Sequence, residues 1–402
     1  MSKMAPQIRF QDFTDDWEER KLEELTLVLT GFPFKNEDFV DNGKYLVITN
    51  GNIQNESSAV DVSLGNRVDD LSDEIKERYY LNKNDILVTM DGTVGRTAKV
   101  VDDNMILAQR VARLVANKNT EFVYQWLNQG SFFNEMTKVS HGGTIKHISL
   151  NEISNYSATV PSNNIEQQKI GSFFKQLDDT IALHQRKLDL LKEQKKGFLQ
   201  KMFPKNGSKF PELRFSGFAD DWEERKLGEL GSVAMNRRIF KDQTSENEEV
   251  PFFKIGTFGS KPDAFISREL FEEYKLKYPY PEIGDILISA SGSIGRTVVY
   301  QGEDEYFQDS NIVWLKHDNR LDNKFLKQFY SIVKWQGLEG STIKRLYNKN
   351  ILDTDISIPS TIEQNKIGMF FEQLDDTIAL HQRKLDLLKE QKKGFLQKMF
   401  VS

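Results

Sequence analysis

Cysteine is absent from this chain of 402 residues, so it can form neither a disulfide nor a thiolate metal site. Long apolar runs are absent as well: none approaches the roughly 20 residues that a membrane-spanning helix needs. The first residues also lack the apolar core of a secretory signal. These absences predict a cytoplasmic protein with no membrane segment. The length of 402 residues is enough for two or three domains.

An excess of positive charge is also missing. The chain has 54 Lys and Arg against 60 Asp and Glu, which gives a net charge of −6. Proteins that bind nucleic acid unaided usually carry a basic patch and a net positive charge. Any DNA contact must therefore come from local basic patches, or from a partner that supplies charge.

Recognisable catalytic motifs are missing too. None of the five histidines lies in a His-x-x-x-His or His-Glu-x-x-His frame. The Gly-x-x-Gly-Arg-Thr loops lack the Gly-Lys-Ser/Thr ending that a phosphate-binding loop requires, and no two prolines are adjacent, which excludes the Asn/Asp-Pro-Pro-aromatic box of amino-methyltransferases. We therefore predict a chain with no catalytic residues, no metal and no bound cofactor; an undetected enzyme site stays open as a minor alternative.

What the sequence does contain is a long internal repeat. Residues Ile165–Phe203 return as Ile362–Phe400, and the shorter string Asp15–Leu22 returns unchanged as Asp220–Leu227. The long copies differ only at Gln168/Asn365, Ser172/Met369 and Lys175/Glu372. The segments between these strings have diverged. This pattern predicts one module duplicated with its surface changed.

Each diverged segment carries the signals of a mixed α/β module. Apolar runs bounded by turn residues predict strands at 45–49, 85–90, 97–101 and 111–115, and again at 252–255, 285–289, 297–300 and 312–316. Short helices are expected at 121–134 and 323–334. A matched loop follows the second strand of each module, at 91–97 and 291–297.

The two repeated segments predict long helices that pair with each other. Apolar residues and two polar ones alternate at spacings of four and three, as in a coiled coil, at Ile170, Phe174, Leu177, Ile181, His184, Leu188, Leu191, Lys195, Phe198 and Met202. An antiparallel pair places the modules at opposite ends, related by a pseudo-two-fold axis, whereas a parallel pair requires the second module to span the helix length. We expect the antiparallel pair, with His184 and His381 either fixing the register or tolerated there.

The predicted fold is therefore α+β, with two globular mixed α/β modules separated by two long helices that form an antiparallel intramolecular coiled coil. The repeat boundaries divide the chain into a first module at 1–162, a central helix at 163–204, a second module at 205–359 and a C-terminal helix at 360–402.

A second stripe lies off the coiled-coil seam, formed by Leu183, Leu190, Gly197, Leu380, Leu387 and Gly394. Glycine inside a helix costs about 1 kcal/mol relative to alanine, so close approach of another backbone is one reason to keep it. The stripe is either a docking face for a second protein or a surface that packs against the chain's own modules.

The order of these landmarks resembles a known family. Each long helix opens on Ile-Glu-Gln-x-Lys-Ile-Gly, at Ile165–Gly171 and Ile362–Gly368. The module before the first helix carries Asp85-Ile-Leu-Val, a Gly-Thr-Val-Gly loop and Gly143-Thr-Ile-Lys146. Over essentially the whole chain, this duplicated order resembles the specificity subunit of a type I restriction-modification system, the HsdS family.

The resemblance implies that each module is a target recognition domain that reads one half of a bipartite double-stranded DNA sequence. The paired helices would fix the gap between the half-sites. Two modification subunits would dock on the chain, bring S-adenosylmethionine and methylate an adenine in each half. Two restriction subunits would add cleavage driven by ATP and Mg²⁺. The alternative is a coiled-coil scaffold that does not bind DNA, which the acidic net charge favours.

Polar side chains on the module loops are the candidates for DNA contact, although each is also an ordinary surface-loop residue. In the first module they are Thr49, Asn50, Asn52, Thr93, Arg96, Gln109, Arg110, Lys146 and His147. In the second they are Lys254, Thr257, Ser291, Ser293, Arg296, Gln308, Asn311, Lys344 and Arg345.

Some of these candidates differ between the modules and others do not. Arg96 and Arg296 occur in both, which favours a shared phosphate or structural role. Gln109-Arg110 and the unlike Gln308–Asn311 are better carriers of specificity. A further basic set on the first helix either faces phosphates in the gap or is a solvated face: Arg186, Lys187, Lys192, Lys195, Lys196 and Lys201.

Overall fold

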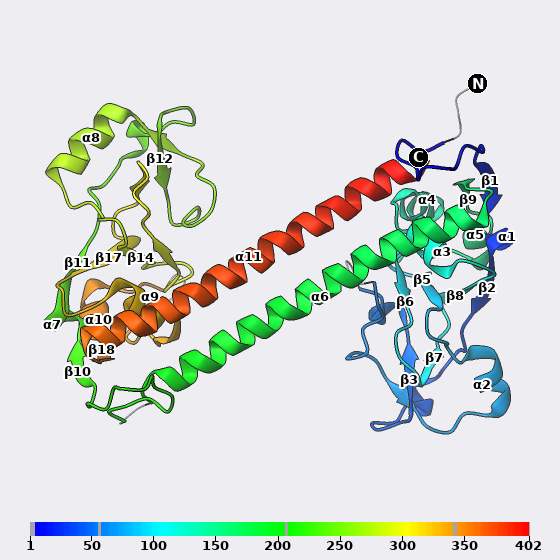
Figure 1. The fold of residues 1–402 in the computed structure, drawn as a ribbon, viewed down its shortest axis with the longest axis horizontal. Helices are drawn as coiled ribbons and strands as arrows, with labels where there is room; N and C mark the ends of the chain where they lie inside the picture. Colours follow the sequence, from blue (N-terminus) through cyan, green and yellow to red (C-terminus); the bar gives the residue numbers. More distant parts are fainter. Residues whose placement is uncertain (1–4, 55–57, 206–207, 341–343, 402) are drawn as a thin grey trace. The chain divides into compact units, whose positions relative to one another are not determined.

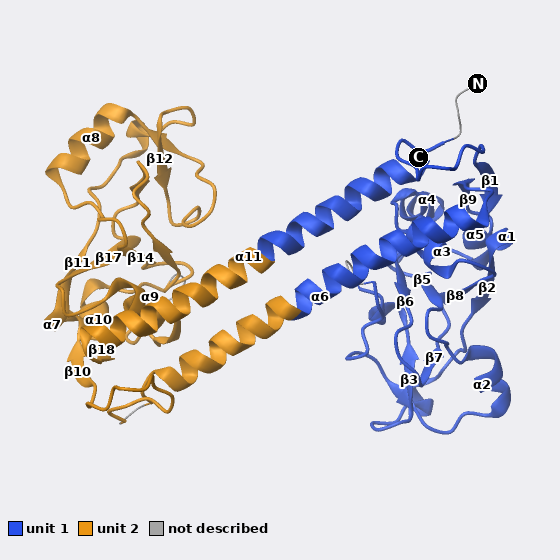
Figure 2. Cartoon of the chain, in the orientation of Figure 1, with its two compact units in different colours: residues 1–186, 382–402 blue, residues 187–381 orange. Residues whose placement is uncertain are grey.

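The computed structural model describes residues 5–54, 58–205, 208–340 and 344–401. The chain divides into two compact units, residues 1–186 with 382–402 and residues 187–381 (Figure 2). Each unit takes one half of each long helix. No helix within the described ranges is both long and apolar enough to cross a membrane.

Unit 1 is built on three small sheets (Figure 1). An antiparallel sheet has the order β2-β8-β5-β6, a mixed sheet has the order β4-β3-β7, and β1 pairs with β9. The strands are β1 Glu18–Lys21, β2 Thr26–Thr30, β3 Tyr45–Ile48, β4 Arg67–Val68, β5 Ile86–Thr89, β6 Thr97–Lys99, β7 Met105–Leu107, β8 Val111–Ala116 and β9 Ser157–Val160. The helices are α1 Leu22–Leu25, η1 Asn36–Asp38, η2 Asn50–Asn52, α2 Asp73–Tyr79, α3 Thr120–Leu127, α4 Ser131–Val139 and α5 Leu150–Ser154, followed by α6 Asn164–Met202.

Unit 2 repeats this topology, with sheets ordered β11-β17-β14-β15, β13-β12-β16 and β10-β18. Its strands are β10 Glu223–Lys226, β11 Gly231–Ala234, β12 Val250–Phe253, β13 Phe265–Ile266, β14 Ile286–Ser289, β15 Thr297–Val299, β16 Tyr306–Phe307, β17 Ile312–His317 and β18 Asp355–Ile358. Its helices are α7 Leu227–Leu230, η3 Lys241–Gln243, α8 Arg268–Lys277, α9 Asn323–Ile332 and α10 Asn348–Leu352, followed by α11 Thr361–Met399. The predicted mixed α/β modules are confirmed.

The central strand of each module is buried on both faces. In β5, Ile86 and Val88 belong to the core that contains the helices, whereas Leu87 belongs to a second core beneath the β3 sheet. In β14, Ile288 likewise belongs to the core that contains the helices, and Leu287 belongs to a second core. A strand with two buried faces needs a continuous apolar run, which explains why Ile86-Leu-Val was recognisable in the sequence.

The two long helices pair antiparallel. In unit 1 the beginning of α6 meets the end of α11, where the Phe173 and Phe395 rings lie 5.2 Å apart. In unit 2 the end of α6 meets the beginning of α11, where Phe198 and Phe370 lie 5.1 Å apart. Both helices have 39 residues. The predicted antiparallel pairing is therefore confirmed.

The lysines on the predicted seam form ion pairs between the helices. Lys195 contacts Asp375 at 2.5 Å in unit 2, and Lys392 contacts Asp178 at 2.6 Å in unit 1. Asp375 also accepts a hydrogen bond from Lys327 at 3.0 Å. Burial raises the pKa of the Asp375 carboxyl, but the hydrogen bonds from the two lysines outweigh it and the pKa is lowered. These pairs favour one helix register, because a slipped pair would leave half-buried charges unmatched.

The repeated string at each helix start anchors the helix to its module. Asn163 and Ser360 accept from the backbone N–H groups of Ile165 and Glu363, as N-cap side chains do. Glu166, however, binds Arg9 through two hydrogen bonds of 2.6 and 2.8 Å, and is fully buried. A Cβ on Gly171 would lie 2.7 Å from the backbone N of Phe122, so only glycine lets α6 approach α3 this closely.

Some local predictions were wrong. The single helix expected at 121–134 is two helices, because the chain breaks at Gly130 with φ +108°. Strands β1 and β2 were missed; in β1, Glu18–Lys21, all four residues are polar and its pairing with β9 is set by tertiary contacts.

Candidate functional site

Three distant segments meet at the end of β5 in unit 1. The backbone N–H of Met90 donates to the carbonyl of Arg110 at 3.1 Å, and that of Ile148 donates to the carbonyl of Met90 at 2.9 Å. Asp91 therefore lies beside both Arg110 and His147. Its carboxylate contacts His147 Nδ1 at 2.8 Å and Arg110 Nε at 3.8 Å.

Unit 2 repeats this backbone arrangement at the end of β14. Ala290 donates to the carbonyl of Asn311 at 2.7 Å, and Leu346 donates to the carbonyl of Ala290 at 2.8 Å. Ser291 donates from its hydroxyl to Asn311 Oδ1 at 2.7 Å and forms a backbone bridge with Arg345. We call these two sets the strand-end clusters: Asp91, Arg110 and His147 in unit 1, and Ser291, Asn311 and Arg345 in unit 2.

The matched Gly-x-x-Gly loops are rigid supports for exposed side chains. Thr89 Oγ1 donates to the carbonyl of Thr93 at 2.6 Å and accepts from the backbone N–H of Arg96 at 3.0 Å, and Ser289 does the same in unit 2. Thr93 and Ser293, at the loop tips, are exposed. The loops therefore hold one polar tip residue each in a fixed position.

The two loop arginines behave differently although their local sequences match. Arg96 is half-buried, and its Nε has no hydrogen-bond partner within the described part of the chain. Arg296 is exposed, and its guanidinium lies over Gly259. A common structural role for the two side chains is therefore not visible in these contacts.

Several predicted residues serve the scaffold of their own loops. Asn52 is 1% exposed and donates its amide hydrogens to the carbonyls of Asp61 and Leu64. Gln308 accepts from the backbone N–H of Ile255 at 2.9 Å, and Thr257 bonds the backbone of Lys254.

The remaining candidates lie elsewhere on the modules. Lys254 pairs with Asp263 at 2.9 Å. Asn50 is half-buried with an Oδ1 that lacks a hydrogen-bond partner in the described chain. Four other candidates are exposed: Thr49, Gln109, Lys146 and Lys344. In the second module the string Ser341-Thr-Ile-Lys344 corresponds to Gly143-Thr-Ile-Lys146 of the first, and its residues 341–343 lie outside the described ranges.

Sequence reasoning missed Asp91, which joins the unit 1 cluster. Its carboxylate binds two predicted residues that are 19 and 56 positions away along the chain. The only sequence signal was its place at the start of the matched loop, where unit 2 has Ser291.

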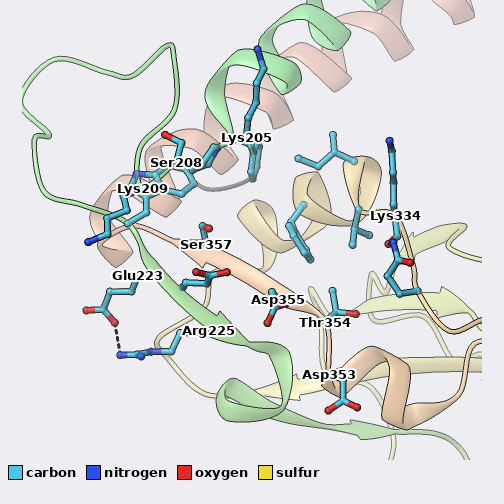
Figure 3. A pocket seen from close by; sticks show the side chains of 18 of the residues that line it. Lys205, Ser208, Lys209, Glu223, Arg225, Lys334, Asp353, Thr354, Asp355 and Ser357 are labelled. Carbon is cyan, nitrogen blue, oxygen red and sulfur yellow. Dashed lines mark hydrogen bonds and ion pairs between the residues drawn. The ribbon is translucent and has the colours of Figure 1, made fainter.

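A cleft with about 1020 Å³ of space lies in unit 2 (Figure 3). It is bounded by the end of α6, by β10 and β18, and by α9 and α10. Its lining mixes charges of both signs and contains no histidine: Lys205, Lys209 and Lys334 stand with Glu223, Asp353 and Asp355. Nor does any cluster of three or more His, Asp or Glu in the described ranges form a metal site.

The off-seam stripe is open to solvent. In unit 1, Leu183 and Leu387 are 62% and 54% exposed; in unit 2, Leu190 and Leu380 are 49% and 60% exposed. A Cβ placed on Gly197 or Gly394 would meet no other atom within 4 Å. Of the two interpretations of the stripe, packing against the chain's own modules therefore finds no support in these contacts.

The basic set on α6 is not uniform. Lys195 is half-buried and bound to Asp375, so it belongs to the helix pair. The other members are exposed: Arg186, Lys187, Lys192, Lys196 and Lys201.

These features define a class of protein. One scaffold is built twice, its helical parts are nearly identical, and each copy presents a different set of polar side chains on the same backbone frame. Such a molecule is suited to recognising two different targets.

Comparison with known proteins gives the family. The model of the type I restriction modification DNA specificity domain matches residues 14–193 and again residues 219–390. The chain therefore belongs to this family and contains its domain twice. Membership supports the predicted specificity role over the alternative of a scaffold without DNA contact.

Two relatives and two solved structures agree with this assignment. The putative type I restriction enzyme specificity subunit S.HindORF215P of Haemophilus influenzae is 56% identical over 158 residues, 38% of this chain and 41% of that relative. The putative MjaX specificity subunit of Methanocaldococcus jannaschii is 23% identical over 96% of this chain and 93% of its own length. The crystal structure of the S subunit from M. genitalium has a TM-score of 0.69 at 17% identity, covering 99% of this chain and 100% of that one. A chain from a structure of type I R-M complex assembly has a TM-score of 0.52, again at 17% identity, over 96% and 98% of the two chains.

Proposed function

We propose that this chain is the DNA specificity subunit of a type I restriction-modification complex. Residues 1–162 and 205–359 act as target recognition domains, and each reads one half of a bipartite target. The helices at 163–204 and 360–402 set the gap between the half-sites. The observation that carries the proposal is the pair of strand-end clusters, in which the same backbone hydrogen bonds present Asp, Arg and His in one module and Ser, Asn and Arg in the other.

The exposed and half-buried candidates divide by role. Loop side chains that carry hydrogen-bond donors, acceptors or both suit base edges: Thr49, Thr93, Gln109, Arg110, His147, Ser293, Asn311 and Arg345. Lys146, Lys344 and Arg296 suit phosphates, which position the protein without reading sequence. Asn52, Thr257, Gln308, Ser291 and Lys254 shape or support the loops through the contacts described above.

We further propose that the catalytic subunits supply the chemistry and part of the charge. Two modification subunits would bring S-adenosylmethionine and methylate adenine, and two restriction subunits would bring ATP and Mg²⁺, with the complex working in the cytoplasm. A net charge of −6 is then compatible with DNA binding, because partners that close around the duplex can neutralise its phosphates.

The off-seam stripe is the proposed docking face for the modification subunits. Replacing Gly197 and Gly394 with alanine is expected to stabilise the free chain by about 0.5–1 kcal/mol per site, because alanine favours the helix and its Cβ meets no other atom. The same double variant should bind the modification subunit more weakly if a partner backbone approaches these glycines. Thermal unfolding of the free chain and copurification with the modification subunit measure the two effects.

Gly171→Ala is the matched control on the same helix. Its Cβ would clash with the α3 backbone, so it should destabilise the free chain. Unchanged copurification of the Gly197→Ala, Gly394→Ala variant would remove the glycines from the docking face.

The test of the function is to co-express the chain with its modification subunit and map methylated adenines across the host DNA. A single bipartite motif with two unlike half-sites is expected. A host without such a motif contradicts the proposal.

A heptad inserted between Arg186 and Lys187, and another between Arg383 and Lys384, tests the role of the helices. Seven residues add about 10.5 Å of helix, or about three base pairs of DNA. The gap should lengthen while both half-sites stay the same, whereas one insertion alone should misalign the pair and abolish methylation. Altered half-sites with matched insertions would contradict the ruler role.

A further inference from the structure

The strand-end clusters occupy equivalent positions but differ at every side chain. Position 110 corresponds to 311, because the backbone carbonyl of each accepts a hydrogen bond from the residue that follows the central strand, Met90 or Ala290. Position 147 corresponds to 345, because the next residue, Ile148 or Leu346, donates to the carbonyl of that same residue. The bridge between Asp91 and His147 likewise corresponds to the bridge between Ser291 and Arg345. The two modules therefore share the same backbone contacts here, while all three side chains differ between them.

The first position of each cluster orients a neighbour. Asp91 holds His147 through Nδ1, which leaves Nε2 as the ring nitrogen available to another molecule, and it also lies beside Arg110. Ser291 donates to Oδ1 of Asn311 and thereby fixes which way that amide points. The side chains of Asp91 and Ser291 are themselves largely buried, whereas that of Arg110 is 58% exposed.

Stability alone does not explain the unit 1 cluster. A partly exposed ion pair such as that of Arg110 with Asp91, at 3.8 Å, contributes little to folding. Arg110 also adopts a φ of +71°, a conformation that is strained for any residue other than glycine. Backbone strain of this kind is concentrated at ligand-binding and active sites.

The chemistry of the exposed members matches base edges in the major groove. Arginine pairs with the O6 and N7 atoms of guanine, and asparagine pairs with N6 and N7 of adenine. The arginine stands at position 110 in unit 1 but at position 345 in unit 2, which is the equivalent of His147. The two modules therefore carry the side chain suited to guanine at different positions of the same backbone arrangement.

Resting on the proposed function, we propose that the strand-end clusters determine which bases the two modules read. Arg110 and His147 contact bases in the first half-site, and Asn311 and Arg345 contact bases in the second. Asp91 and Ser291 are positioning residues that act through these neighbours.

The experiment uses the whole chain co-expressed with its modification subunit, with three variants of unit 1. These are Asp91→Asn, Arg110→Lys, and the exchange Asp91→Ser, Arg110→Asn, His147→Arg, which gives unit 1 the side chains of unit 2. Methylated adenines are mapped for each. We expect changed or relaxed bases in one half-site only, while the half-site read by unit 2 remains as an internal reference. Arg345→Lys should have the converse effect.

Binding to duplexes measures the size of the effect. The ratio of Kd values for a duplex with a scrambled first half-site and for the intact target should fall roughly tenfold or more in Asp91→Asn and Arg110→Lys, since one bidentate base contact is worth a factor of this order. The ratio for a scrambled second half-site should not change. This measurement applies also to a variant whose methylation is too weak to map.

Asp103→Asn is the matched control, because it removes the carboxylate of another exposed ion pair of unit 1, that of Asp103 with Lys83 at 3.2 Å. It should leave both half-sites and both ratios unchanged. Unaltered half-sites and ratios in Asp91→Asn and Arg110→Lys would overturn the inference while the proposed function stands. Absence of any bipartite motif with the unaltered chain would instead overturn the proposed function itself.

Discussion

Replacing Arg9 with methionine is expected to lower the free energy of unfolding of unit 1 by about 3–5 kcal/mol. Arg9 binds the Glu166 carboxylate through both Nε and Nη2, and the glutamate side chain is 0% exposed. Methionine fills a similar volume but leaves that carboxylate buried without its counter-ion. Denaturation of the purified chain by urea, followed by intrinsic fluorescence, measures the loss.

The repeat supplies an internal replicate of this prediction. Arg214 and Glu363 form the same pair in unit 2, at 2.7 Å for both hydrogen bonds, so Arg214→Met should cost a similar amount in that unit. The double variant Arg9→Met, Glu166→Met removes both charges and should recover much of the loss. Lys175→Met, which breaks an exposed pair with Asp179, should change stability by less than about 1 kcal/mol. Equal effects of Arg9→Met and Lys175→Met would contradict this account.

Phe400→Ala is expected to destabilise unit 1 by about 3–5 kcal/mol, a large effect for a residue so near the end of the sequence. The Phe400 ring is 3% exposed and lies 5.8 Å from Phe122, 6.0 Å from Phe174 and 6.4 Å from Trp17. It therefore closes the core of a module that begins almost 400 residues earlier. Calorimetry should show the lower unfolding temperature.

Phe203→Ala tests the same packing in unit 2. Phe203 follows α6 as Phe400 follows α11, and it lies 5.2 Å from Phe325 and 6.1 Å from Trp222. A similar loss of stability is expected. Phe133→Ala, at a ring that is 38% exposed, serves as the control with an expected change of about 0.5 kcal/mol or less. A Phe400→Ala protein as stable as this control would exclude Phe400 from the core.

The sequence patterns predicted the elements whose formation depends on neighbouring residues, namely the long helices and the central strands. Each long helix was predictable from its capping residue and its alternating apolar positions, because these depend on neighbours within about one turn. The central strands were predictable because both faces are buried and their sequence is continuously apolar. Strand β1, whose residues are all polar, forms only because β9 pairs with it, and this left no local signal.

The candidate site was predictable only in part. Arg110 and Asn311 were singled out as polar residues just before an apolar strand, and His147 and Arg345 as polar residues that follow the Thr-Ile-Lys strings. Their grouping was not predictable, because residues 91, 110 and 147 are joined by backbone hydrogen bonds between segments far apart in sequence. Asp91 was missed for the same reason: nothing near it in the sequence indicates a histidine as its partner.

The sequence by itself determined the duplication, the paired helices and the family to which the chain belongs, because repeats and helical periods are one-dimensional properties. Only the tertiary structure decided which charges fix the helices, Lys195 with Asp375 and Arg9 with Glu166, and which polar side chains converge at the end of each central strand. Those contacts join residues 20 to 180 positions apart in the sequence. The energy of such a contact depends on geometry that no local pattern encodes.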